Sequence, residues 1–241
     1  MLTLTIKLPK SLSLFSSIAF LILFTSGAFA QDAETRNEVV KFGIGIKAVA
    51  TSELLSGGAT AFQLKNVDFG YEPNLSQGVD AIVRFKLKDR FSFQTGISST
   101  RRSYSYNIST DTSAYSGSLV QTSFQMPFTG LLQVQINDKM RIGTEAGYVA
   151  EMFPGDIATG DDNHYTLIYV RKRLNSALKA SAFTNYELNS GAKIELGLTY
   201  HRMLGRMGTF YMDYEAISET ISAKSDLQGH YFALNLAYFF R

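Results

Sequence analysis

The chain has 241 residues, with 23 Lys and Arg, 21 Asp and Glu, three His and no Cys. A formal net charge of +2 gives no electrostatic reason to expect nucleic acid as a partner. Without cysteines the fold cannot depend on disulfides, even in an oxidising compartment.

The first part of the chain has the pattern of a secretory signal. Lys7 and Lys10 form a positive region, an apolar run follows, and the small-residue sequence Ala-Phe-Ala ends at Ala30. We therefore expect cleavage between Ala30 and Gln31. Subtracting the two Lys of the signal from 23 basic residues leaves 21 basic against 21 acidic residues, so the mature chain is neutral. The predicted domains are a signal segment, 1–30, and a mature domain, 31–241.

After the signal, apolar and polar residues alternate with a period of two in eight segments. In the second segment, for example, Val79, Ala81 and Val83 alternate with Asp80 and Arg84. This alternation is typical of strands with one apolar and one polar face, and no later run approaches the roughly 18 apolar residues of a spanning helix. The eight segments are 41–51, 78–88, 91–104, 119–136, 140–150, 177–188, 192–203 and 230–241.

The links between these segments alternate in length. Three are tight turns of turn-forming residues, at 88–90, 137–139 and 189–191. Four are long, at 52–77, 105–118, 151–176 and 204–229. This pattern predicts an all-β fold, an eight-stranded antiparallel up-and-down transmembrane β-barrel with four long outer loops and three short periplasmic turns. We expect a bulge or break at Pro127, which has no amide donor, and a strand that protrudes past the bilayer at Arg101 and Arg102.

Two stretches resemble a known family. The segment 78–96 has a Gly-initiated strand, a short Lys/Asp turn and the sequence Phe91-Ser-Phe-Gln94. The segment 123–130 has a Pro at 127 and Gln125 where the family usually carries an acid. In these features the chain resembles the PorT-like, OmpA-like small outer-membrane β-barrels. The resemblance implies a fold and a bacterial outer-membrane location, but it implies no activity.

If apolar side chains face lipid, several charged side chains must point into the barrel. An eight-stranded barrel is just wide enough inside for side chains to fill it, and a buried charge needs a partner. We therefore predict a lumen ion-pair network that joins Lys47 and Arg84 to Glu145 and Glu195. A structural plug is favoured over a path for protons or ions.

The three His are the residues to consider for an enzyme. His201 lies near the outer end of its segment but faces the lumen, and His164 lies in an acidic loop. His230 is close in sequence to Ser225 and Asp226, a weak pattern for nucleophilic chemistry. A solvated rim or loop position explains each His more simply, so no catalytic residue is assigned.

The long loops suggest three further sites. Asp156, Asp161, Asp162 and Asn163 carry oxygen ligands but lack EF-hand spacing, so neither a metal nor another cofactor is expected. Arg171-Lys172-Arg173 could contact lipopolysaccharide phosphates or pair with acids of its own loop, and the sequence leaves both open. Phe210, Tyr211 and Tyr214 are expected at exposed positions, where they would bind a partner, join the interfacial aromatic girdle or prolong the seventh strand.

These observations predict a non-enzymatic integral outer-membrane β-barrel protein with a structural or adhesive role, or one accessory to an envelope complex. The expected partners are outer-membrane lipid, lipopolysaccharide and another envelope protein, and not nucleic acid. Three alternatives stay open. One is a barrel enzyme that modifies envelope lipid, and another is a soluble lipocalin-like periplasmic binding barrel. The third is a diffusion pore, which the small number of strands disfavours.

Overall fold

The computed structural model describes residues 40–55, 60–216 and 219–241. The predicted signal segment 1–30, with cleavage between Ala30 and Gln31, lies outside these residues. The described part contains fourteen strands and one four-residue helix, and none of its helices could cross a membrane. The predicted all-β antiparallel character is confirmed.

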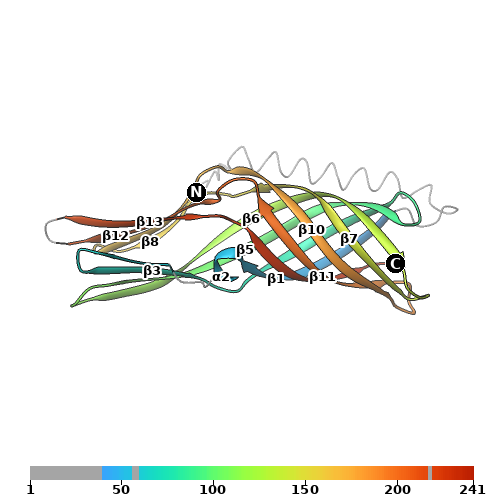
Figure 1. The fold of residues 1–241 in the computed structure, drawn as a ribbon, viewed down its shortest axis with the longest axis horizontal. Helices are drawn as coiled ribbons and strands as arrows, with labels where there is room; N and C mark the ends of the chain where they lie inside the picture. The colour runs from blue at the N-terminus through green and yellow to red at the C-terminus, as the bar shows by residue number, and fades with distance from the viewer. Residues whose placement is uncertain (1–39, 56–59, 217–218) are drawn as a thin grey trace, which may run out of the picture. The chain divides into compact units, whose positions relative to one another are not determined.

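Eight long strands form what we call the ring, in which each strand pairs with two antiparallel neighbours (Figure 1). Their side chains alternate between the two faces of the sheet. In the first strand Ile44 and Ile46 are exposed on the outside, whereas Gly45 and Lys47 are buried inside. In ring order the strands are β1 (Val40–Thr51), β4 (Ser76–Lys86), β5 (Phe91–Ser109), β6 (Ala114–Gln135), β7 (Met140–Met152), β10 (Leu174–Glu187), β11 (Lys193–Met203) and β14 (Tyr231–Phe239), which pairs again with β1.

The remaining strands occupy segments that the sequence predicts to be long loops. After the short helix α2 (Ser52–Leu55), β2 (Thr60–Leu64) and β3 (Val67–Pro73) continue the ring's sheet beside the far half of β5. A separate four-stranded sheet contains β8 (Ile157–Gly160), β9 (His164–Val170), β12 (Gly208–Glu215) and β13 (Thr220–Leu227). The predicted count of eight strands is therefore wrong for the described chain, because the long links fold as well. Even the predicted loop 105–118 is mostly the continuation of β5 and β6.

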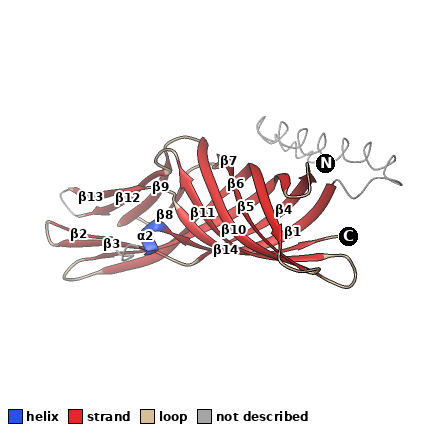
Figure 2. Cartoon of the chain, turned by 45° about the vertical axis from the view of Figure 1, so that its right-hand side comes forward, coloured by secondary structure: helices blue, strands red, loops and turns tan. Residues whose placement is uncertain are grey.

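These additional strands and the far ends of β5 and β6 form what we call the sandwich. Figure 2 shows β2, β3, β12 and β13 together at one end of the described chain, away from the short turns of the ring. The inner faces of its two layers meet: the rings of Tyr71 and Phe210 stack with centroids 4.7 Å apart. Tyr115 and Tyr214 meet across the layers at 6.2 Å. Burial of apolar surface between two sheets is the force that folds these segments.

The sandwich core corrects one prediction about exposed aromatics. Phe210 is fully buried, while Tyr211 and Tyr214 are half-buried. The alternation that buries Phe210 also buries Met212 on the same strand. Short strands of this kind carry a weaker signal in the sequence than the long strands of the ring, which is why a loop is predicted here.

The ladder between β5 and β6 is interrupted at Pro127. Thr95 pairs with Phe128 and Ser98 pairs with Gln125 in the same register, but the two residues of each strand that lie between these pairs are not paired. Pro127 has no N–H to donate. Gly96, on the facing strand, has a φ of 153°, and a Cβ there would collide with the carbonyl oxygen of Ala81. The expected local break is therefore present, and a bulge is not, because the register does not shift.

Candidate functional site

The interior of the ring is occupied by charged and amide side chains that contact one another. Near the short-turn end, the Arg84 guanidinium donates to Glu195 at 2.8 Å and to the amide oxygen of Gln94 at 2.9 and 2.6 Å. The guanidinium carbon also lies 4.3 Å from the centroid of the Phe239 ring. Glu195, Gln94 and Phe239 lie on three different strands of the ring, so the Arg84 side chain links these strands across the interior.

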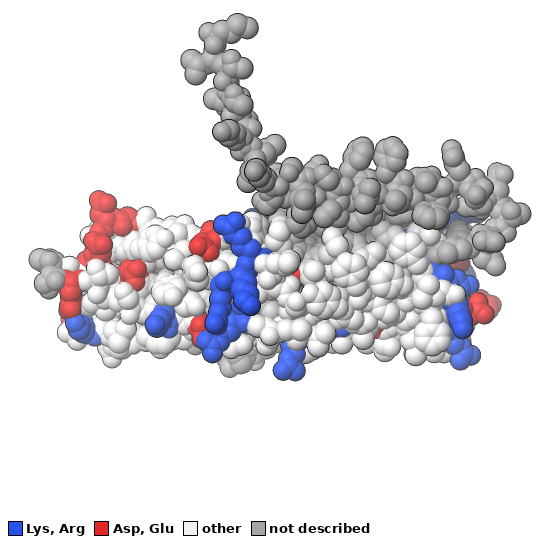
Figure 3. All heavy atoms as spheres, turned by 90° about the horizontal axis from the view of Figure 1, so that it is seen from above, with Lys and Arg blue, Asp and Glu red and all other residues white. Residues whose placement is uncertain are grey.

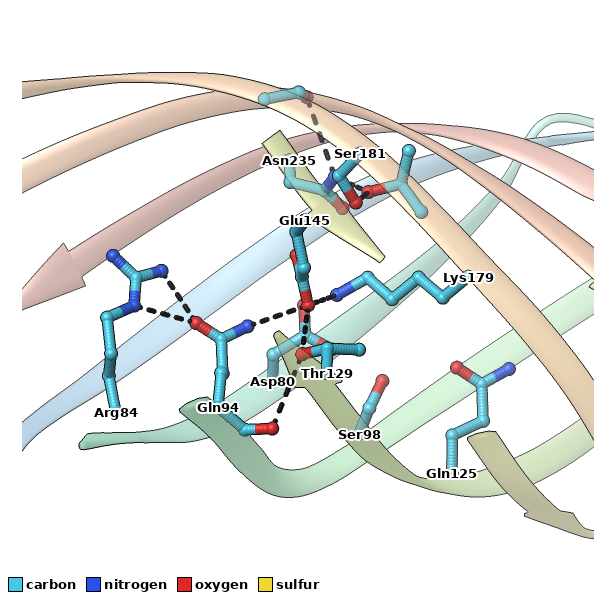
Figure 4. Close-up of polar contacts among 12 residues, drawn as sticks. Asp80, Arg84, Gln94, Ser98, Gln125, Thr129, Glu145, Lys179, Ser181 and Asn235 are labelled. Atoms are coloured by element: carbon cyan, nitrogen blue, oxygen red, sulfur yellow. Dashed lines mark hydrogen bonds and ion pairs between the residues drawn. The ribbon is translucent and has the colours of Figure 1, made fainter. Parts of the chain in front are cut away.

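Gln94 connects Arg84 to a second group centred on Glu145 (Figure 4). One oxygen of Glu145 accepts from Gln94 at 3.1 Å, from Lys179 at 2.9 Å and from Thr129 at 2.6 Å. Three donors, one of them charged, therefore satisfy this carboxylate at a position that is only 5 % exposed. A carboxylate that is removed from water needs hydrogen-bond donors and a cation of this kind in place of its hydration.

A third group lies around Lys47. Its ammonium donates to Asp80 at 3.1 Å, to Gln125 at 3.3 Å and to the hydroxyl of Ser98. The hydroxyl of Tyr231 donates to the same oxygen of Gln125 at 3.0 Å. An ammonium has three hydrogens to donate, and these contacts use all of them.

The fourth group, beneath the sandwich, is centred on Glu151, which is fully buried. Arg102 donates to one of its oxygens at 2.9 Å, and His201 Nε2 lies 3.0 Å from the other. The His201 ring stacks on Tyr231 with centroids 4.4 Å apart. Gln125 also donates to Glu151 at 2.9 Å, so this group is continuous with the one around Lys47.

The charges of the interior balance. Four cations and four anions form four ion pairs, which are Lys47–Asp80, Arg84–Glu195, Arg102–Glu151 and Lys179–Glu145. Removing one member of such a pair leaves an uncompensated buried charge, at a cost of about 3–5 kcal/mol. The network therefore links the strands of the ring and favours one arrangement of them.

All four residues of the predicted lumen network are indeed placed inside, but their partners differ in part. Arg84 meets Glu195, as the prediction has it. Lys47 instead pairs with Asp80, and Glu145 pairs with Lys179. Arg84 reaches Glu145 only through Gln94. Cross-strand register, which the sequence does not reveal, decides these partners.

Sequence reasoning missed the group beneath the sandwich. Arg102 was expected where the strand protrudes from the bilayer, but it is fully buried. A signal was present, because Arg102 shares its alternation with Gln94 and Ser98, which also face inward. Glu151 lies one residue beyond the predicted end of its segment, so it is not among the residues predicted to face inward.

Little space is left among these side chains in the residues that the structure describes. A cavity of about 50 Å³ lies between Lys47, Ser98, Gln125, His201 and Tyr231. One buried water requires at least about 10–15 Å³ by this measure, so the cavity has room for a few waters and none for an organic substrate.

In the described part of the chain, His230 does not meet the serine and the acid that lie near it in sequence. His230 Nδ1 accepts from the amide of Met203 at 3.1 Å. The residues expected near it have other partners, since Ser225 contacts Tyr71 and Asp226 pairs with Arg206. No contact joins His230 to either of them in the described residues, and His201 is held by Glu151.

The acidic loop around His164 forms a hydrogen-bonded turn. One oxygen of Asp161 accepts from the amides of Asn163 and His164 at 2.9 and 3.1 Å and from His164 Nδ1 at 2.9 Å. Chiefly the bond from the Asn163 amide lowers the pKa of the Asp161 carboxyl. Asp156 accepts instead from the amide of Val170 at 2.8 Å. Across the described residues, no three His, Cys, Asp or Glu gather as metal ligands would.

Comparison with known proteins adds little. No family model matches the chain, and no curated protein matches it. The predicted membership of the PorT-like, OmpA-like family therefore stays a prediction.

Several solved structures are weakly similar to the chain. The translocator domain of the autotransporter NalP from Neisseria meningitidis is 13 % identical with a TM-score of 0.35, covering 95 % of this chain and 98 % of that one. The outer membrane protease OmpT from Escherichia coli is 9 % identical with a TM-score of 0.35, covering 83 % and 92 %. The transport unit of the autotransporter AIDA-I from Escherichia coli is 10 % identical with a TM-score of 0.29, covering 93 % and 96 %. Scores this low assign no function, so function must be inferred from the chain's own contacts.

Proposed function

We propose that the chain is a non-enzymatic integral protein of the bacterial outer membrane, exported through a cleaved signal. In this proposal the ring is an eight-stranded transmembrane β-barrel, and the sandwich is a rigid body held outside the cell. The role is structural or adhesive, or accessory to an envelope complex that the sandwich contacts.

The observation that carries the proposal is the orientation of side chains in the ring. The outside presents exposed large apolar residues from several strands, such as Ile46, Val79, Leu196 and Leu234. The inside presents four ion pairs. For a protein in water this distribution is unfavourable on both faces, because apolar side chains would be exposed to water and charged ones buried. A bilayer favours it, because the outer apolar side chains then contact lipid.

The same orientation weighs against the soluble lipocalin-like alternative. That fold holds its ligand in an apolar interior, and the interior here is polar with a cavity of about 50 Å³. Short links such as 137–139 join the strands at one end of the ring, and the sandwich segments leave from the other. Outer-membrane barrels have short turns on the periplasmic side and long connections outside, which gives the proposed orientation.

The proposal is tested by gel mobility of protein extracted from the outer-membrane fraction. We expect unboiled protein to migrate differently from boiled protein, because a closed hydrogen-bonded barrel resists detergent until it is heated. Recovery of the protein in the soluble periplasmic fraction, without a heat-dependent shift, would overturn the membrane assignment.

A second prediction concerns ion conduction. Protein reconstituted into a planar bilayer should give no stepwise conductance at moderate voltage, because ion pairs fill the interior. The heat-dependent gel shift of the same preparation serves as the control for correct folding. Regular conductance steps from folded protein would show that the interior opens and would favour a diffusion pore.

A further inference from the structure

A collar of basic side chains lies where the sandwich meets the ring. Figure 3 shows Lys and Arg side chains gathered in a band across the described surface. The segment between β9 and β10 contributes three consecutive exposed cations, and the β11–β12 side contributes two more. The collar residues are Arg171, Lys172, Arg173, Arg202 and Arg206.

The collar borders a groove that has both charged and apolar walls. The groove has a volume of about 360 Å³, and Arg171, Lys172 and Arg206 line it together with Leu174 and Leu204. The two leucines are 69 % and 57 % exposed, so their side chains are available to an apolar group of a ligand. A ligand that satisfies both walls must be amphipathic and anionic.

The backbone of the collar segment is held firmly by hydrogen bonds. The amide of Arg171 donates to the Met207 carbonyl at 3.3 Å, and the Arg173 carbonyl accepts from the Phe153 amide at 2.8 Å. The side chain of Asn175, only 8 % exposed, donates to the Lys172 carbonyl at 2.6 Å. The three cations therefore project from a fixed backbone, which lowers the entropy lost when they bind a ligand.

These cations are not neutralised by the acids of their own loop. In the part of the chain that the structure describes, Arg171, Lys172 and Arg173 take part in none of the ion pairs. Arg206 does pair with Asp226. Of the two alternatives that the sequence left open, the structure thus favours an external anion for the three consecutive cations.

Below the groove the surface continues as the lipid-facing side of the ring. Ser176 lies opposite Leu204, whose amide donates to the Ser176 carbonyl at 2.8 Å. Two residues further along β10, on the same outer face, Leu178 is paired with Arg202 on β11 and with Tyr148 on β7. Leu178 and Tyr148 are 49 % and 42 % exposed. An apolar chain that begins at the leucines of the groove can therefore run down this face, beside an interfacial tyrosine.

We propose that this groove binds a phosphorylated lipid of the outer leaflet, of the lipid A type. Arg171 and Lys172 contact its phosphate, and Leu174 and Leu204 contact the first part of an acyl chain. Arginine suits a phosphate because its planar fork can donate two parallel hydrogen bonds. The inference rests on the proposed function, since only membrane insertion brings the groove to the lipid surface.

The test is a binding measurement on folded, detergent-purified protein. Purified bisphosphorylated lipid A is titrated and the bound complex is counted by native mass spectrometry, with inorganic phosphate and phosphatidylcholine as separate probes. We expect saturable binding of lipid A that the double variant Arg171→Gln/Lys172→Gln weakens by about tenfold or more, as loss of charge-assisted contacts requires. The matched control is Lys88→Gln/Arg90→Gln, two exposed cations in a turn of the opposite end, which should bind as the parent does.

A second variant separates the lipid from a free anion. Leu174→Ser/Leu204→Ser should also weaken lipid A binding severalfold, because the acyl contact is lost, and millimolar inorganic phosphate should not displace the lipid. Equal binding by the parent and both groove variants would overturn the proposal, as would displacement by phosphate with no effect of the leucine change. A normal heat-dependent gel shift in every variant shows that failure here leaves the proposed function intact.

Discussion

Replacing Glu151 by leucine is expected to lower the free energy of unfolding by about 3–5 kcal/mol. In the parent protein the Glu151 carboxylate accepts a hydrogen bond from the Arg102 guanidinium at 2.9 Å. The substitution leaves this guanidinium fully buried without a carboxylate partner. It also removes the partner of His201 Nε2, which lies 3.0 Å away. The chain has no Trp, so unfolding in urea should be followed by far-UV circular dichroism of protein folded in lipid vesicles.

Two variants show whether the loss comes from the unpaired charge. Arg102→Met/Glu151→Leu removes both members of the pair and should recover most of the stability, because a buried pair replaced by apolar residues is often neutral. Glu219→Gln breaks the exposed pair with Lys65, which should cost at most about 1 kcal/mol. If the double variant is as unstable as Glu151→Leu alone, packing and not charge explains the effect.

The interior network shows what alternation along a strand can predict and what it cannot. Alternation decides which face of a strand a side chain occupies, and Lys47, Arg84, Glu145 and Glu195 all lie on the inner face, as their alternation predicts. It does not decide which residues on different strands stand at the same height. The height of a residue in the ring depends on register and on the tilt of the strands. Asp80 and the predicted partners of Lys47 all have inward alternation, and only the register shows that Lys47 pairs with Asp80.

The sandwich was not predictable in the same way. Its strands are as short as the four residues of β8, and the links between them are turns within the predicted loops. Their apolar and polar residues alternate, as in Val67, Phe69 and Tyr71, but over runs of only four to eight residues, and the sheet that buries them comes from distant parts of the chain. Phe210 illustrates this: it stacks on Tyr71, 139 residues earlier in the numbering, and on nothing that its own neighbours supply.

The sandwich and the ring differ in what holds them, and this difference has a measurable consequence. Among the described residues, the four-stranded sheet of β8, β9, β12 and β13 has no ladder to the ring's sheet. Besides the chain connections and side-chain contacts such as Tyr71–Ser225, its attachment rests on the apolar core that the two layers share, in which Phe210, Met207 and Leu227 are fully buried. Weakening that core should therefore release the four-stranded sheet while the ladders of the ring stay intact.

Phe210→Ala is accordingly expected to destabilise the sandwich by about 3–5 kcal/mol, the usual cost of removing a buried phenyl ring. It removes the stacking with Tyr71 at 4.7 Å and the edge contact with Tyr104 at 6.1 Å. Hydrogen exchange read by mass spectrometry should rise strongly in β9, β12 and β13. The heat-dependent gel shift, which reports the ring, should persist.

Tyr211→Ala is the matched control, because Tyr211 is the next residue on the same strand and its side chain points to the opposite face of the sheet. It should change exchange in these strands little, since a half-buried outward ring has no partner layer to lose. Equal exchange in the two variants would contradict a two-layer core built on Phe210. Loss of the gel shift in Phe210→Ala alone would show instead that the sandwich and the ring fold as one cooperative unit, and that β5 and β6, which run through both, transmit the damage.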